Sequence, residues 1–391
     1  MARAVAALPI TGFALCNGLG ATVEAVRTRL YEGQSGLGPS PVPCPFPTVV
    51  GAVDCALPEL PKELQPWSTR TARIAQLLIT QLEAPLARLR ARVRPERIAV
   101  ILGTSTVGAD VTEDAFRHYL EQGALPANYD LWRHHTYGAL LHVVTHLIGA
   151  RGPAWIVSTA CTSSAKPFAT AQRLLAAGLV DAAVVGGIDT LCSMTLRGFF
   201  SLDSLAPAAC RPFNAKRDGI NIGEGGALLV LERAGDALAL LEAVGESSDA
   251  YHISAPHPQG VGARLAMLRA LEQAGVAASD IDYVNAHGTG TRLNDSAEAQ
   301  AISSLLGDHV PVVSTKGYTG HMLGGAGASE AVITLLSLMD GFVPASLGAG
   351  PVDEAITLNI PMTRQHGRYH RALSNSFAFG GNNVSVLLRA V

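Results

Sequence analysis

Short apolar runs alternate with longer segments of helical periodicity along most of the chain. The apolar runs have the length of β-strands and lie at residues 4–12, 98–103, 155–157, 181–188, 227–232, 281–286 and 310–315, with two more strands within 373–388. Helical spacing of apolar side chains covers residues 22–32, 69–92, 136–148, 263–273, 295–306 and 326–338. Residues 33–66 predict irregular surface, and 110–122 predict a polar helix or loop. Strands that alternate with helices indicate an α/β fold.

One α/β pattern occurs twice. Ile-Val-Ser-Thr at residues 156–159 and Val-Val-Ser-Thr at 312–315 each lead into a corner and a helix. A glycine turn precedes an apolar strand at 219–231 and again within 373–388, at nearly the same separation along the chain. This echo predicts two copies of one unit, divided as 1–239 and 240–391, unless two common strand patterns coincide. Paired halves would bring their corners to a shared crevice, where α/β sheets bind ligands.

Composition narrows the range of partners and compartments. Hydrophobic residues make up 48% and charged residues only 16% of the 391 residues, against roughly 25% charged in an average protein. We therefore expect a large core and a dimer with a buried interface. A net charge of −3 gives no basis for nucleic-acid binding, and no apolar run approaches the ~18 residues of a membrane span. The six cysteines lack paired spacing, so we expect neither metal sites nor disulfides and a cytoplasmic location.

Cys161 stands at the corner between the strand 155–157 and a helix with Phe168, Ala171, Leu174 and Leu175 at spacings of three and four. Backbone N–H groups and the helix dipole at such a corner would stabilise a thiolate, which is the nucleophilic form of cysteine. With Ser164 as the N-cap, the helix would begin slightly after Cys161, which weakens the dipole effect. The alternative is a cysteine that acts only as a small buried hydrophobic residue.

Three further stretches carry candidate chemistry. Residues 285–295 (NAHGTGTRLND) place His287 after a strand, and residues 314–330 hold Lys316, His321 and Glu330 around a glycine-rich corner. Residues 375–383 (NSFAFGGNN) form a glycine turn that could present a backbone N–H. Each stretch taken alone also has a purely structural interpretation.

Together, in order and spacing, these four stretches resemble the β-ketoacyl-acyl carrier protein synthases, the elongating condensing enzymes of the thiolase superfamily. The resemblance extends to residues 10–20, 211–232 and 249–260, whereas residues 33–135 match the family poorly. It implies a thiolase-like fold, in which two duplicated α/β halves form a layered αβαβα arrangement. It also implies an acyltransferase activity: decarboxylative Claisen condensation of an enzyme-bound acyl group with malonyl-acyl carrier protein, which elongates a fatty acyl or polyketide chain.

The resemblance assigns a role to each candidate residue. Cys161 would hold the acyl group as a thioester, and the backbone N–H groups of Cys161 and Phe379 would bind the carbonyl oxygen. His287 and His321 would stabilise the malonyl enolate, with Lys316 and Glu330 organising the site electrostatically. The remaining implied residues bind substrate, namely Thr289, Thr291 and Phe377, or form a supporting polar shell, namely Asp295 and Glu298. No cofactor is implied, because the phosphopantetheine arm arrives with the carrier protein.

One departure from the family pattern and the choice of partner follow from the same comparison. Ala378 replaces the family's first turn glycine, which would cost about 1 kcal/mol or more if that position needs positive φ. The run ACTSSAK from residue 160 resembles synthases of aryl polyene pathways, which implies a heterodimer with a cysteine-less, chain-length-limiting sister subunit. A homodimer is the alternative. Arg70 and Arg73 are candidate contacts for an acidic carrier protein, but a solvated helix face is the stronger interpretation of both residues. Two rival functions are a non-catalytic chain-length partner and a thiolase-type acyltransferase acting on coenzyme A thioesters.

Overall fold

The computed structural model describes residues 5–391 and confirms the α/β fold. Residue 4, where the first predicted strand begins, lies outside this range. Ten strands form one sheet, in the order β10-β9-β13-β14-β8-β1-β7-β6-β4-β5. The first half contributes β1 (Leu8–Cys16), β4 (Ile98–Gly103), β5 (Ala154–Val157), β6 (Ala182–Asp189) and β7 (Gly225–Glu232). The second half contributes β8 (Ala239–Ser248), β9 (Tyr283–Asn285), β10 (Val312–Val313), β13 (Arg371–Phe377) and β14 (Asn382–Ala390).

The two halves of the sheet repeat one topology, which confirms the predicted duplication. Read outward from the centre, β1-β7-β6-β4-β5 corresponds to β8-β14-β13-β9-β10. The three outer strands of each half are parallel, and the two inner strands pair antiparallel in both. The halves join where β1 pairs with the start of β8. The predicted division at 239/240 falls at the first residues of β8, and as a domain boundary it stays a prediction.

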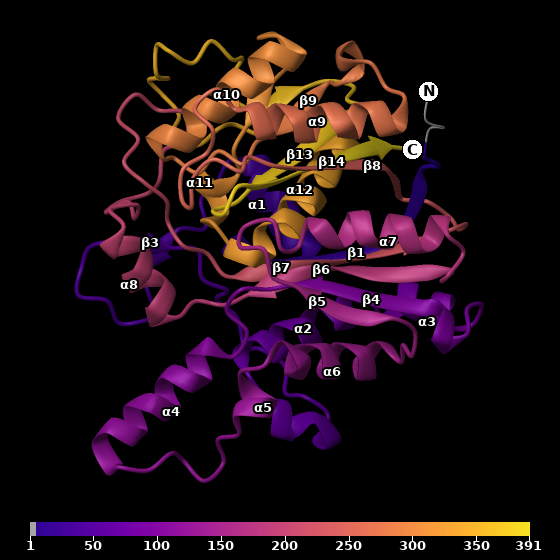
Figure 1. The fold of residues 1–391 in the computed structure, drawn as a ribbon, viewed down its shortest axis with the longest axis vertical. Coiled ribbons are helices and arrows are strands. Elements are labelled where there is room, and N and C mark those ends of the chain that lie inside the picture. The colour runs from indigo at the N-terminus through magenta and orange to yellow at the C-terminus, as the bar shows by residue number, and fades with distance from the viewer. Residues whose placement is uncertain (1–4) are drawn as a thin grey trace.

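Helices complete the five layers expected from the resemblance (Figure 1). Helices α7 (Lys166–Ala176) and α12 (Ala326–Asp340) lie between the two half-sheets, and α12 contacts strands of both. Helices α2 (Arg70–Gln81) and α6 (Tyr137–Ile148) cover one outer face, while α9 (Val261–Ala274) and α10 (Arg292–Leu306) cover the other. The first 13 residues of α12 are all buried, and its many small side chains let both sheets approach closely.

Local sequence explains where several elements differ from prediction. The predicted helix 69–92 breaks at Leu82 into α2 and α3 (Glu83–Arg90), because Pro85 lacks an N–H for the helical ladder. Residues 22–32 form a helix as predicted, α1 (Val23–Glu32), capped by the Thr22 side chain. Residues 110–122 form the helix α4 (Ala109–Gln122). Helix α8 (Ser193–Ser201) was not predicted.

The remaining elements are short. They are β2 (Gly38–Pro39), β3 (Val49–Val50), β11 (Phe342–Val343), β12 (Gln365–His366), α5 (Leu131–His134), α11 (Lys316–Thr319), and the 3₁₀ turns η1 (Lys62–Trp67), η2 (Pro95–Arg97), η3 (Ala278–Asp280) and η4 (Leu323–Gly325). Strand β5 was expected to be buried, but all four of its residues are only half-buried because it is the edge of the sheet. No helix within residues 5–391 is long and apolar enough to cross a membrane.

Candidate active site

Cys161 lies in the turn that joins β5 to α7. The backbone of this turn approaches the end of β4 so closely that a Cβ on Gly103 would stand 2.1 Å from the carbonyl carbon of Ser163. Ala160 has φ = +51°, a left-handed value that costs a residue with a Cβ on the order of 1 kcal/mol or more. The tight turn presents Cys161 at the carboxyl ends of parallel strands, and nothing in the sequence marks the strained alanine.

The thiol of Cys161 is protonated at neutral pH, which corrects the expectation of a helix-stabilised thiolate. Helix α7 begins only at Lys166, and the expected cap Ser164 instead accepts a hydrogen bond from the N–H of Ala328 at 3.0 Å. Burial raises the pKa of Cys161 to about 11, although Lys316 and nearby backbone N–H groups lower it. Desolvation therefore outweighs the stabilising groups around the sulfur.

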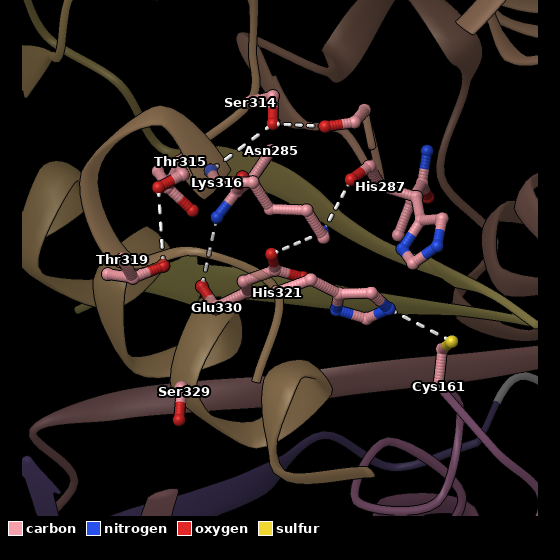
Figure 2. Close-up of polar contacts among 12 residues, drawn as sticks. Cys161, Asn285, His287, Ser314, Thr315, Lys316, Thr319, His321, Ser329 and Glu330 are labelled. Carbon is pink, nitrogen blue, oxygen red and sulfur yellow. Dashed lines mark hydrogen bonds and ion pairs between the residues drawn. The ribbon is translucent and has the colours of Figure 1, made fainter. Parts of the chain in front are cut away.

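Two histidines lie beside this thiol (Figure 2). His321 Nε2 is 2.9 Å from Cys161 Sγ, and the His287 ring stands at 83° to the His321 ring with 5.3 Å between centroids. Burial, assisted by the positive charge of Lys316, lowers the pKa of both imidazoles well below the ordinary value. Both rings are therefore neutral at neutral pH, and each can donate from one nitrogen and accept at the other.

A buried ion pair supports the histidines. Lys316 opens α11 directly after β10, and its Nζ lies 2.6 Å from Glu330 Oε1 on α12. The same Nζ donates to the carbonyl oxygen of His287. Burial raises the pKa of the Glu330 carboxyl, and the charge of Lys316 lowers it. The pair thus fixes the backbone of His287 and keeps a paired cation beside both imidazoles.

Two carboxylates hold the neighbouring loops. Glu298 on α10 accepts hydrogen bonds from the N–H groups of His287 at 2.8 Å and Gly288 at 2.7 Å. Asp295 on the same helix accepts from the N–H of Phe213 at 2.8 Å. Both side chains are buried, and burial raises the pKa of Glu298 to about 7. Asp295 also accepts from the N–H of Gly290 at 3.2 Å, so both expected supporting residues lie behind the loop that carries His287.

A cavity of about 420 Å³ opens onto Cys161, within the range of about 300–1,000 Å³ common for ligand pockets. Its lining includes both aromatic residues of the glycine turn, the buried Phe377 and the partly exposed Phe379. Thr289 and Thr291 also line it, and their hydroxyl groups share a hydrogen bond of 2.9 Å. The structure therefore gathers all of the expected substrate-binding residues at one cavity.

The glycine turn between β13 and β14 reaches the nucleophile. The backbone N–H groups of Phe379 and Cys161 lie close enough to the sulfur to lower the pKa of the thiol. Ala378 does not have a positive φ; the left-handed positions are Gly380, at +82°, and Gly381, at +77°. The conditional strain at Ala378 therefore does not arise, and its substitution for glycine leaves the turn intact.

Asp189, at the end of β6, is a buried residue that the sequence did not single out. Its Oδ1 accepts hydrogen bonds of 2.6–2.9 Å from the Thr104 hydroxyl and the N–H groups of residues 105 and 106. Its Oδ2 accepts from the N–H of Gly324, three residues after His321, at 2.6 Å. The carboxylate thus joins the loop after β4 to the segment that carries His321. An acidic residue ending an apolar strand was the available signal.

Arg70 and Arg73, the candidate carrier-protein contacts, are engaged within the fold. Arg70 donates to the buried carboxylate of Glu224 and to the carbonyl oxygen of Val53. Arg73 pairs with Glu59 at 3.1 Å and donates to backbone carbonyls. Because both guanidinium groups already have acceptors, neither supports the docking hypothesis.

Comparison with known families agrees with this geometry. The family model described as "Beta-ketoacyl synthase, N-terminal domain" matches residues 7–237, and "Beta-ketoacyl synthase, C-terminal domain" matches residues 238–349. The chain is 32% identical to 3-oxoacyl-[acyl-carrier-protein] synthase 2 of Vibrio cholerae, over 97% of this chain and 98% of the relative. It is 31% identical to nodulation protein E of Rhizobium meliloti, over 98% of both chains.

Solved structures give the same result. The ketosynthase ApeO in complex with its chain length factor ApeC from Xenorhabdus doucetiae matches with a TM-score of 0.93 and 38% identity, over 98% of both chains. The ishigamide ketosynthase/chain length factor matches with a TM-score of 0.90 and 26% identity, over 100% of both chains. Both halves of the chain, its fold and its full-length relatives agree, and the chain belongs to the β-ketoacyl synthase family of acyltransferases.

Proposed function

We propose that the chain is a β-ketoacyl-acyl carrier protein synthase that condenses an acyl group held on Cys161 with malonyl-acyl carrier protein. The observation that carries this proposal is the buried thiol in contact with His321 and beside His287, at a cavity where two backbone N–H groups also face the sulfur. Relatives named 3-oxoacyl-[acyl-carrier-protein] synthase 2 support the carrier-bound substrates.

The first step transfers the acyl group. Cys161 Sγ attacks the carbonyl carbon of the incoming thioester, while its proton passes to His321 Nε2, 2.9 Å away. The resulting oxyanion accepts hydrogen bonds from the backbone N–H groups of Cys161 and Phe379. When the tetrahedral intermediate collapses, the carrier's thiol leaves with the proton, and the acyl group stays on Cys161 as a thioester.

The second step forms the carbon–carbon bond. The malonyl thioester loses carbon dioxide, and the electron pair of the broken bond forms an enolate. The enolate oxygen accepts hydrogen bonds from the ring N–H groups of His287 and His321, and each such donor supplies on the order of 2.7–4 kcal/mol. The enolate carbon then attacks the acyl carbonyl on Cys161, and the sulfur leaves as a thiolate that takes up one proton from solvent, because its original proton left with the first carrier's thiol. The Lys316–Glu330 pair holds the backbone of His287 throughout.

The chemistry needs no prosthetic group bound to this chain. The phosphopantetheine arm is part of the carrier protein, and the hydroxyl groups of Thr289 and Thr291 at the cavity suit its amide groups. This assignment of the two threonines rests on the residue-by-residue resemblance and on their position.

Separating the two half-reactions tests the proposal. Cys161→Ala should abolish acylation and condensation but still release carbon dioxide from malonyl-carrier protein, because the enolate donors remain. His287→Ala should instead reduce carbon dioxide release by a factor of ~10² or more, because it removes one donor to the enolate. Acylation of Cys161 should survive better in that variant, since the donors to the first oxyanion are backbone groups. Intact-mass spectrometry and carbon dioxide release measure the two activities separately.

A surface histidine provides the matched control. His146 on α6 is half-exposed and lies beside His142 rather than at the cavity, so His146→Ala should leave both activities unchanged. The proposed division of roles is wrong if His287→Ala decarboxylates normally while failing to acylate Cys161.

The rival functions explain less of the site. A non-catalytic chain-length partner would not need Cys161 beside two histidines. A thiolase-type acyltransferase carries a second catalytic cysteine, and Cys161 is the only cysteine lining the cavity among residues 5–391. Labelling of Cys161 by acyl-coenzyme A in preference to acyl-carrier protein would favour the thiolase alternative.

A ketosynthase-like second subunit is the partner that this chain best fits. Two similar structures are of ketosynthases with chain length factors, and the one at 38% identity is ApeO with ApeC. Together with the ACTSSAK run, this supports a heterodimer and an aryl polyene type of product, with a homodimer as the alternative. Co-expression with a sister chain that lacks the cysteine should give a stable one-to-one complex, whereas purification of only the self-associated chain would favour the homodimer.

A further inference from the structure

The three side chains of the proposed active site also form a set of metal-binding donors. The Sγ of Cys161 and ring nitrogens of His287 and His321 lie within 4.8 Å of one another. All three residues are at most 9% exposed, yet each lines the cavity. Figure 2 shows them converging from the corners of the two halves. Because one thiol and two imidazoles from separate loops face the same point, all three can coordinate a single metal ion.

The distances suit a small tetrahedral cation. Zinc takes thiolate sulfur at about 2.3 Å and imidazole nitrogen at about 2.0–2.1 Å, so its ligand atoms lie roughly 3.3–3.7 Å apart. The Sγ–Nε2 distance between Cys161 and His321 is 2.9 Å, and the longest separation among the three donors is no more than 4.8 Å. Side-chain rotations that move these atoms by less than an ångström or so would meet the required geometry. The fourth position would face the cavity and take water.

The donor types select the ion. Magnesium and calcium prefer oxygen ligands, whereas one sulfur and two imidazole nitrogens suit zinc. The nearby cation, Lys316, is paired with Glu330, so an incoming divalent ion meets a salt-bridged ammonium group, whose remaining charge at the two imidazoles opposes binding and limits the affinity.

From this arrangement we propose that Cys161, His287 and His321 bind one Zn²⁺ ion reversibly, and that the bound ion inhibits the enzyme by occupying its nucleophile. On binding, the Cys161 S–H bond breaks, its proton leaves to solvent and a Zn–S bond forms, with no change of oxidation state. A metal-bound sulfur cannot attack a thioester until the ion dissociates. Metal binding itself does not depend on which thioester the enzyme uses, whereas the inhibition rests on the proposed role of Cys161 as the nucleophile.

The surroundings of the ligands limit the affinity. In structural and catalytic zinc sites, the second ring nitrogen of a ligating histidine usually donates a hydrogen bond to a carboxylate or carbonyl oxygen. Within residues 5–391, the Nδ1 atoms of both histidines are buried without a hydrogen-bond partner. We therefore expect a Kd on the order of micromolar, as for an inhibitory site, and not the tight binding of a structural zinc site.

Cobalt substitution tests the site directly. Co²⁺ added to the metal-free protein should give the visible bands of a tetrahedral complex and a near-ultraviolet thiolate charge-transfer band, at one ion per chain. Excess Zn²⁺ should abolish both signals, whereas Mg²⁺ should not. Cys161→Ala should lose the charge-transfer band, and His321→Ala should weaken binding at least ~10-fold. Cys161→Ser, together with thermal melting of every variant, separates loss of the ligand from loss of the fold.

Two controls exclude other ligands. Cys44→Ala removes a half-buried cysteine outside the cavity, and His146→Ala removes the surface pair with His142 on α6. Both variants should bind one ion with unchanged affinity. Free Zn²⁺ at tens of micromolar, in excess over the protein, should also protect Cys161 from iodoacetamide at least ~10-fold, and chelation should restore labelling. The inference is overturned if cobalt shows no thiolate band, if Cys161→Ala binds the ion as tightly as the native chain, or if labelling of Cys161 ignores zinc.

Discussion

The contact between Cys161 and His321 joins two neutral groups, and this determines how the thiol responds to pH. Burial raises the pKa of the thiol to about 11 and lowers that of the imidazole, so at pH 7 the proton stays on sulfur. Many reactive cysteines instead exist as thiolate–imidazolium pairs, with thiol pKa values well below 8.5. In this protein the thiolate fraction must keep rising until the pH approaches 11.

Alkylation of Cys161 by iodoacetamide should therefore rise about tenfold per pH unit from pH 7 to pH 10, with no plateau in that range. Peptide mapping by mass spectrometry, with a chelator present, measures the rate at Cys161. The half-buried Cys44 in the same samples provides an internal comparison. A plateau for Cys161 below pH 8 would show that the resting state is an ion pair and that the buried, neutral description is wrong.

Sequence alone located the residues of the site but not their ionisation. Cys161, His287, His321 and Lys316 each follow a strand, so their shared position follows from α/β topology and from the family resemblance. The raised pKa of Cys161 depends on how completely the surrounding segments exclude water, which the sequence does not encode locally. The role of Asp189 could not be predicted either, because the five groups that donate hydrogen bonds to it come from two loops that are distant in the sequence.

At the scale of elements, Asp189 links the end of β6 to loops from both halves. Replacing it with asparagine exchanges one acceptor oxygen for an amino group that would face N–H or O–H donors. Asp189→Asn should lower the free energy of unfolding by about 1–3 kcal/mol, the cost of leaving buried polar groups without partners. It should also reduce carbon dioxide release more than thermal stability alone explains, because the segment after His321 loses its anchor at Gly324. Urea denaturation and the decarboxylation assay measure the two effects.

Asp181 supplies the matched control. It is half-buried, and its carboxylate pairs with Arg97 at 2.8 Å and Arg233 at 3.4 Å at the surface, where an ion pair contributes about 0–1 kcal/mol. Asp181→Asn should therefore change stability little and decarboxylation not at all. Equal losses in the two variants would remove any special role for Asp189.

The bounds of a helix or strand could be predicted where its own residues determine them. Strand β4 has the predicted bounds because five apolar residues end at a glycine. In the helix after Cys161, the predicted positions Phe168, Ala171 and Leu175 are buried, whereas Leu174 is half-buried. The start of α7 was placed too early because Ser164 turns toward α12 instead of capping. Strand β8 was not predicted, although it is a central strand of the sheet, between β1 and β14.

At the scale of the whole molecule, duplication explains why the site lies where it does. The corner after β5 carries Cys161, and the equivalent corner after β10 carries Lys316 and His321. The central helices hold the two half-sheets back to back, so residues about half a chain apart meet at one cavity. The repeated sequence pattern predicted that the two corners meet at one crevice. The sequence did not predict the arm, which is the extension formed by α4 and α5, because residues 33–135 match the family poorly.

That arm carries the clearest sign of a subunit interface. Helix α4 extends from the body of the molecule in Figure 1, and of its residues only Ala109 and Ala115 are buried. Phe116 is 57% exposed, Leu120 69% and Trp132, on α5, 76%. Large apolar side chains gathered on one exposed segment mark a protein-interaction surface more often than a free one. The half-buried edge strand β5 adds unpaired backbone groups that also favour a covering subunit.

The double substitution Phe116→Glu and Leu120→Glu should therefore convert the assembly into monomers. Burying two carboxylates in an apolar interface costs several kilocalories per mole, whereas in the isolated chain both positions are already exposed. Sedimentation velocity at low micromolar concentration should show a dimer for the native chain, alone or with a sister subunit, and a monomer for the variant. Leu238→Glu, at an exposed position between β7 and β8, should leave the dimer intact. Because both substituted positions are exposed in the isolated chain, the monomeric variant should keep its thermal unfolding transition. A native chain that sediments as an active monomer would contradict the proposed interface.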